Sequence, residues 1–255
     1  MKKFIGALII AGLFTVLSAA DEGGLKTHAE LSYANTAGNT ESQDLAGNLK
    51  LSYPFLQNEI RFAGNVLYSE NDNFDANGSY VETVTTKNSW DAEANYDYNF
   101  NEALAFNYIA GIKSDEFTSY EYQAYTGPGA VWTAFKNESH DLKFQGNIMW
   151  AWDKHREPYE EGSDVRSHDY AAYQVSMDYV FQITENSKFI QYLMYRSEFD
   201  DTSNYFGKSR TALESKISDI FSMGVSYTVD YTNNIAADVR SYTDRVFLAS
   251  LIADF

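Results

Sequence analysis

The 255-residue chain lacks cysteine, has only three prolines and is poor in positive charge. The absence of cysteine excludes a disulfide framework, a cysteine-ligated zinc or iron–sulfur site and a thiol nucleophile. Its 19 basic and 36 acidic residues give a formal net charge of −17, so nucleic acid is not an expected partner. Aromatic residues make up 16% of the chain, a share that argues against disorder.

Long hydrophobic runs are also absent, except at the start of the chain. Lys2 and Lys3 precede an apolar run over residues 4–17, and small residues follow up to Ala20. This pattern is typical of a secretory signal peptide, and the run is short for the alternative, an uncleaved membrane anchor. The sequence therefore predicts a signal peptide over residues 1–20 and one exported domain over residues 21–255, without a membrane-spanning helix.

The remainder of the chain alternates between apolar and polar residues with a period of two. Trp90, Tyr96 and Tyr98 fall on one face of such a segment, and Asp91 and Glu93 fall on the other. Alternation of this kind indicates β-strands with one apolar and one polar face. It predicts twelve strands, at residues 26–35, 43–55, 59–69, 87–100, 103–115, 122–135, 141–153, 168–183, 187–199, 205–217, 220–231 and 244–255.

The predicted connections alternate between longer and tight ones, which indicates an up-and-down antiparallel meander with two unlike ends. Strands of ten or more residues suit a tilted strand that crosses a bilayer, which needs about 9–11 residues. Gly127, Pro128 and Gly129 should bend or bulge the sixth strand. The fold class predicted is all-β, a transmembrane up-and-down antiparallel β-barrel of about 12 strands, with both termini on the periplasmic side.

Barrel closure removes the exposed strand edges and satisfies every backbone group in hydrocarbon. An inward apolar face would crowd many tryptophan, tyrosine and phenylalanine rings into one interior. We therefore expect the aromatic rows to face outer-membrane lipid, with girdles near both strand ends, and the polar rows to line the lumen. The alternative is a soluble periplasmic β-protein that binds a ligand.

Two segments carry a resemblance to known proteins. The last strand alternates and ends on Phe255, which resembles the signal read by the outer-membrane assembly machinery. Residues 28–50 place Thr36-Ala37-Gly38-Asn39-Thr40 between two alternating strands. This hairpin resembles the opening of the salt-induced outer membrane protein family, domain-of-unknown-function family 481. The resemblance implies a bacterial outer-membrane barrel with a link to salt or osmotic stress, and it supplies no catalytic residues.

No motif in the chain predicts catalysis. Ser139-His140-Asp141 and Ser167-His168-Asp169 contain the letters of a hydrolase triad, but adjacent strand residues point to opposite faces. An outer-membrane hydrolase of lipids or esters is kept as an alternative, with histidine and serine brought together from neighbouring strands. The acidic segments 70–78 and 154–167 are predicted to be solvated loops. The alternatives are weak Ca²⁺ binding at the first and a metal or ligand site at the second. We expect no enzyme activity, no cofactor and no metal.

Charged residues on the predicted inward rows are the candidate functional residues. Basic and acidic side chains occur there in similar number, which fits either paired charges filling a narrow lumen or a channel with a transverse field. The sequence therefore predicts a non-enzymatic outer-membrane barrel of a Gram-negative bacterium, acting as a small porin or as an envelope protein. The candidate lumen-lining residues are Arg61, Lys113, Lys208, Arg210, Asp91, Glu93, Asp178 and Glu214.

Overall fold

The computed structural model describes residues 24–36, 41–74, 79–158, 164–233 and 243–255, and these form twelve β-strands. The strands are β1 (Lys26–Thr36), β2 (Glu41–Phe55), β3 (Asn58–Phe74), β4 (Tyr80–Asn99), β5 (Leu104–Asp115), β6 (Tyr120–Lys136), β7 (His140–His155), β8 (Ser167–Thr184), β9 (Ser187–Glu198), β10 (Tyr205–Lys216), β11 (Phe221–Thr232) and β12 (Thr243–Asp254). The predicted signal peptide, residues 1–20, lies outside the described residues. No helix in the described part of the chain is long and apolar enough to cross a membrane.

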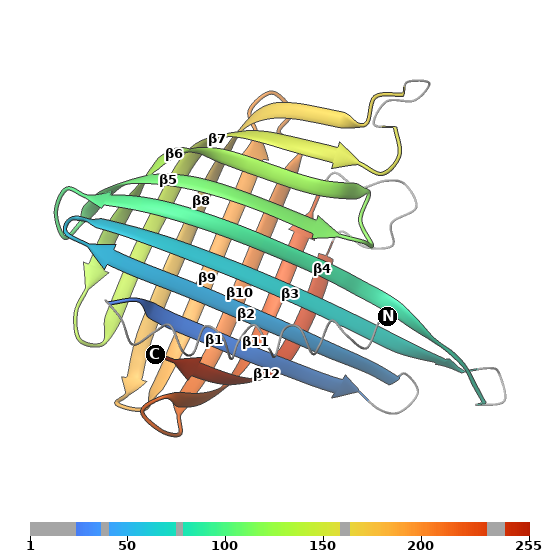
Figure 1. The fold of residues 1–255 in the computed structure, drawn as a ribbon, viewed down its shortest axis with the longest axis horizontal. Coiled ribbons are helices and arrows are strands. Elements are labelled where there is room, and N and C mark those ends of the chain that lie inside the picture. Colours follow the sequence, from blue (N-terminus) through green and yellow to red (C-terminus); the bar gives the residue numbers. More distant parts are fainter. Residues whose placement is uncertain (1–23, 37–40, 75–78, 159–163, 234–242) are drawn as a thin grey trace.

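Each strand pairs antiparallel with its neighbour in sequence, and β12 pairs with β1, so the sheet closes into a barrel (Figure 1). The β1–β12 seam joins six residue pairs, from His28–Asp254 to Tyr33–Ala249. Thr27 and Phe255 exchange two backbone hydrogen bonds of 2.9 Å, so the described ends of the chain meet at the end of the barrel that carries the short turns. The up-and-down barrel predicted from the sequence is confirmed.

The side chains alternate between the lumen and the outer wall as predicted. On β7, Ile148 is 63% exposed on the outer wall while Asn147 is buried on the inner one. Tyr53, Phe100 and Phe221 are exposed near the short turns, and other aromatic rings are exposed near the opposite end, among them Tyr33, Trp90, Phe117, Trp150 and Phe199. This apolar outer wall with two aromatic girdles is typical of a barrel in lipid. A soluble β-protein with an apolar interior, the alternative considered above, does not fit it.

The β3–β4 hairpin is longer than the sequence predicted. We expected strands over 59–69 and 87–100 joined by a loop over 70–86, whereas pairing continues out to Phe74 and Tyr80. Register shifts at Ser69/Glu70 and Asn73/Phe74 interrupt the ladder. Apolar residues such as Val81 and Val84 no longer alternate with polar ones here, so the pattern that marks a membrane strand ends before the strand does. The hairpin extends past its neighbours at one end of the barrel (Figure 1).

Strand β6 departs from the expected bulge. Its register shifts lie at Tyr120/Tyr122 and Thr133/Phe135, while the pairs Thr126–Trp150 and Gly129–Asn147 keep one register across the glycines. An added Cβ on Gly127 would stand 2.7 Å from the Cα of Met149. The two glycines therefore allow the backbones of β6 and β7 to approach closely. They also leave the inner surface of β6 without side chains at this level.

Candidate lumen site

Arg210 and Glu30 form an ion pair across the inside of the barrel. Arg210 lies on β10 and Glu30 on β1, so the guanidinium passes over β11 and β12 to reach the carboxylate at 2.9 Å. Ser250 donates to the same carboxylate at 2.6 Å, and Ser32 donates to it at 3.3 Å. Glu30 is 4% exposed, and these donors compensate for the loss of water around its charge.

Most of the other predicted lumen charges have protein partners as well. Arg61 contacts Asp97 at 2.7 Å, and Glu214 pairs with Lys188 at 2.9 Å. Lys208 approaches Asp230 at 3.6 Å. These residues come from strands β3, β4, β9, β10 and β11, and their pairing fits the prediction of charges that fill part of a narrow lumen.

The two acidic residues on β4 accept hydrogen bonds from neutral groups. Asp91 accepts a hydrogen bond of 2.6 Å from the Asn65 amide. Glu93 accepts one of 2.8 Å from Asn95 and one of 2.6 Å from the Tyr125 hydroxyl. Neither carboxylate forms an ion pair within the described part of the chain, so β4 presents net negative charge to the lumen.

A network of amide side chains joins β4, β5 and β7 near the short turns. The Asn107 amide donates to Asp97 at 2.6 Å, and the Asn147 amide donates to Asn107 at 2.6 Å. Gln145 adds a bond of 2.8 Å to Asn147. The contact between β5 and β7 passes over β6, where an added Cβ on Gly129 would overlap the Asn147 side chain. This network was not predicted from the sequence, although Gly127 and Gly129 beside a polar row were a usable signal.

An aromatic and cationic cluster fills part of the lumen toward the opposite end. The Arg196 guanidinium lies 4.9 Å from the ring centroid of Tyr125 and 4.7 Å from that of Phe206. Lys113 lies 4.6 Å from the same Phe206 ring, and Tyr120 lies 6.4 Å from it. Arg196 and Phe206 are each 4% exposed, so this cluster narrows the passage. Lys113 was predicted as a lumen residue, whereas its aromatic neighbours Tyr125 and Phe206 were not, because contacts between strands far apart in sequence leave no local pattern.

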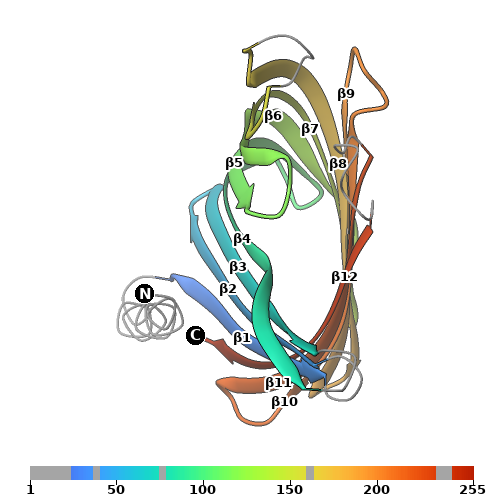
Figure 2. The same ribbon diagram turned by 90° about the vertical axis from the view of Figure 1, so that its right-hand side faces the viewer.

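Lys50 and Asp178 differ from the other inward charges. Lys50 lies on β2 and Asp178 on β8, strands that belong to facing walls of the barrel (Figure 2). Both residues are exposed although they point into the lumen, and each lies within the electric field of the other. Neither forms a hydrogen bond or an ion pair with any residue that the structure describes. The lumen is therefore open at this level, toward the short turns.

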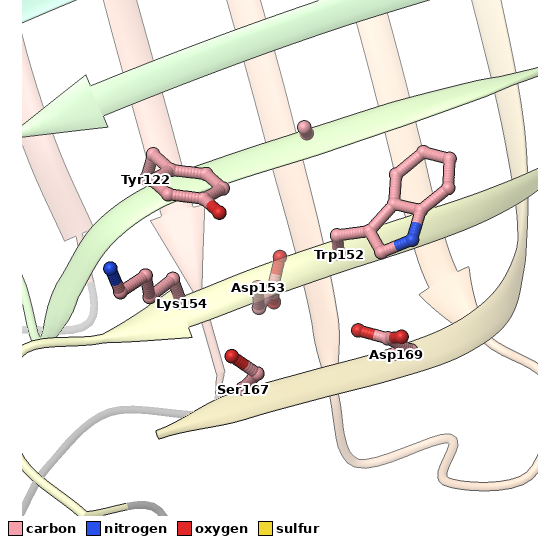
Figure 3. Close-up of a pocket in the computed structure, with 7 residues that line it drawn as sticks. Tyr122, Trp152, Asp153, Lys154, Ser167 and Asp169 are labelled. Atoms are coloured by element: carbon pink, nitrogen blue, oxygen red, sulfur yellow. The ribbon is translucent and has the colours of Figure 1, made fainter.

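A hollow of about 400 Å³ lies outside the lumen, between β6, β7 and β8. On one side of the sheet the hollow is lined by Tyr122, Trp152, Lys154 and Asp169. The side chain of Asp153 points to the other side (Figure 3). Trp150, two residues before Trp152 and on the same face, is exposed on the outer wall, so the hollow belongs to that wall and takes no part in a pore.

The histidines named in the two triplets contact acidic or phenolic groups. His140 Nδ1 lies 2.9 Å from the Tyr179 hydroxyl, and His168 Nε2 lies 3.2 Å from the Glu198 carboxylate. His28 pairs with Asp254 at 2.7 Å. These contacts hold the ends of neighbouring strands together. No group of His, Asp and Glu suited to a metal ion occurs in the described segments.

Comparison with known proteins places the chain in a family. Residues 29–255 match the family model described as "Protein of unknown function, DUF481", which covers almost the whole barrel. The chain belongs to this family, in agreement with the resemblance seen in its first hairpin. A comparison with curated proteins finds no match.

Solved structures share the fold. The COG4313 outer membrane channel from Pseudomonas putida F1 is 10% identical, with a TM-score of 0.53, over 91% of this chain and 96% of that one. The KdgM porin in complex with disordered oligogalacturonate is also 10% identical, with a TM-score of 0.47, over 89% of this chain and 99% of that one. The translocator domain of the autotransporter NalP from Neisseria meningitidis is 8% identical, with a TM-score of 0.47, over 100% of this chain and 96% of that one. The likeness to the COG4313 channel shows that the two chains share the β-barrel fold.

Proposed function

We propose that this protein is a small, weakly selective channel for hydrophilic solutes in the bacterial outer membrane. The observation that carries the proposal is the pair Lys50 and Asp178, which are exposed inside a closed barrel and have no protein partner in the described segments. Ionised side chains without partners are stable only in water, so the lumen must be wet where they lie. A wet, charged interior behind an apolar outer wall is the arrangement that a porin needs.

The other lumen residues divide the passage into two parts. At the end with the longer connections, Arg196, Tyr125 and Phe206 narrow it. Toward the short turns, Lys50 and Asp178 face an open vestibule. Short turns face the periplasm in barrels of this type, so the vestibule would open to the periplasm and the aromatic cluster would face outward. Solute size would be set at the cluster and charge preference in the vestibule.

Single-channel recording in planar bilayers tests this proposal. We expect discrete conductance steps from the refolded protein. The reversal potential in asymmetric KCl should indicate a modest cation preference, because Lys50 and Asp178 oppose each other while Asp91 and Glu93 add negative charge to the lumen. Asp178→Asn should shift the selectivity toward anions, and Lys50→Gln should shift it toward cations. A bilayer that stays silent when folded protein is demonstrably inserted would contradict the proposal and favour a plugged, structural barrel.

Insertion into the membrane requires a recognition signal, and we propose that the C-terminal strand supplies it to the outer-membrane assembly machinery. Strand β12 alternates and is followed by Phe255, whose backbone pairs with Thr27 at the seam. Removing Phe255 should lower the amount of folded barrel in outer-membrane fractions while leaving refolding in detergent intact. Equal assembly of both forms in cells would contradict this role.

A further inference from the structure

The lumen contains many charges but few that a solute could bind. Protein partners of opposite charge already pair with Arg210, Arg61 and Glu214. The ammonium group of Lys113 lies over the Phe206 ring. A charge that is paired at 2.7–2.9 Å offers little net attraction to a passing solute, because its field is largely cancelled. Selectivity must therefore come from the inward charges that are left without a partner.

Lys50 and Asp178 are such charges of opposite sign. The carboxylates of Asp91 and Glu93 on β4 accept hydrogen bonds but form no ion pair in the described segments, so they add negative charge to the same lumen. They come from β2 and β8, on facing walls, so the field between them runs across the passage and not along it (Figure 2). Asp178 also lies within the field of Arg61, Lys143 and the like-charged Glu93. Lys50 lies within the field of the like-charged Arg210 and of Glu30 and Glu214. Lys143 is the cross-strand partner of Asp178 and contacts Asp141 at 3.4 Å, while Arg61 and Glu30 are engaged in the pairs described above.

A transverse field of this kind acts differently on different solutes. A simple anion is attracted by Lys50 and repelled by Asp178, so the two effects offset each other, and the same holds for a cation. A neutral solute without a large dipole is not affected. A small zwitterion can orient its ammonium toward Asp178 and its carboxylate toward Lys50, so the interaction with each residue is favourable.

We infer that the vestibule between Lys50 and Asp178 is a selectivity site for small zwitterions, such as free amino acids and other solutes with an ammonium and a carboxylate. The inference rests on the proposed channel function and specifies its substrate class. Both charged groups are accessible to water, so each contact with the solute is weak. Weak contacts at two points favour entry without trapping the solute, as conduction requires.

Liposome swelling with two isomers tests the inference. The amino acid alanine and the neutral amide lactamide have the same atomic composition, but only alanine is a zwitterion at neutral pH. We expect alanine to enter proteoliposomes about two- to fivefold faster than lactamide, the factor that solvent-exposed ion pairs produce. The double variant Lys50→Gln with Asp178→Asn should bring the two rates to equality.

Two further variants distinguish the effect of the transverse electric field from a general effect of the substitutions on the barrel. Exchanging the charges, as Lys50→Asp with Asp178→Lys, reverses the field but keeps it transverse, so the alanine preference should persist. The matched control, Lys136→Gln with Asp219→Asn, removes one cation and one anion that are exposed near the short turns and should leave the ratio unchanged. Equal rates for the two isomers through the native protein would overturn the inference and leave the channel standing. Entry of neither isomer through inserted protein would overturn both.

Discussion

Arg210 donates to Glu30 at 2.9 Å across two intervening strands, and this ion pair lies beside the shortest ladder of the barrel. The β1–β12 seam closes the sheet, since it joins the first and last strands of the barrel. We predict that Arg210→Gln lowers the free energy of unfolding by about 1–3 kcal/mol, because it leaves a buried carboxylate with fewer donors.

Urea unfolding of the barrel in phospholipid vesicles measures this loss. Lys208→Gln is the matched control on the same strand, because its partner Asp230 lies 3.6 Å away and both side chains are about one-third or more exposed. That variant should change stability by less than about 1 kcal/mol. Equal losses in the two variants would show that the cross-barrel pair has no special role.

The glycines of β6 permit the close approach on which the amide network depends. In Gly129→Ala the new methyl group would overlap the Gly146 carbonyl oxygen and the Asn147 amide, so β6 must move away from β7. We predict a loss of about 1–3 kcal/mol in unfolding free energy. Gly146→Ala is the control, since a Cβ there meets nothing within 4 Å. A Gly129→Ala barrel as stable as the control would remove the steric role assigned to this glycine.

The periodicity of the sequence was sufficient to predict the barrel and the inward direction of its charges. Alternation is local, so Trp90 and Asp91 reveal opposite faces without any knowledge of the fold. Contacts across the lumen are not local: Arg196 meets Tyr125 and Phe206 only after closure has brought β6, β9 and β10 together. The same limit hid which charges are paired, so Asp178 could be placed in the lumen from sequence but not distinguished from Glu214.

The outward direction of the apolar rows predicts a strong penalty for charge on the outer wall. Val175 lies near the middle of β8 and is 50% exposed to the surroundings of the barrel. Val175→Arg should destabilise the barrel in bilayers by about 2–4 kcal/mol, whereas Val175→Leu should be near neutral. The comparison uses reversible unfolding in vesicles. An arginine tolerated as well as the leucine would mean that this face does not contact lipid.

The Phe206 ring attracts two cations, Arg196 and Lys113, from within the lumen. Phe206→Leu keeps an apolar side chain but removes the aromatic face, so we predict a loss of about 1–2 kcal/mol in stability. Loosening the cluster should also raise single-channel conductance. Phe247→Leu, on the outer wall and 58% exposed, is the control and should leave conductance unchanged. If conductance falls or stays constant in Phe206→Leu, this cluster does not limit the passage.

The central claim is that the polar faces of the strands line a wet lumen while the apolar faces meet lipid. The native chain has no cysteine, so single-cysteine variants can be labelled without background. In folded protein in bilayers, Lys50→Cys and Asp178→Cys should react with a small, charged, membrane-impermeant thiol reagent, and Tyr96→Cys and Val225→Cys should resist it. Rapid labelling of the cysteines introduced at positions 96 and 225, with protection of those at positions 50 and 178, would contradict the claim that the polar faces line the lumen.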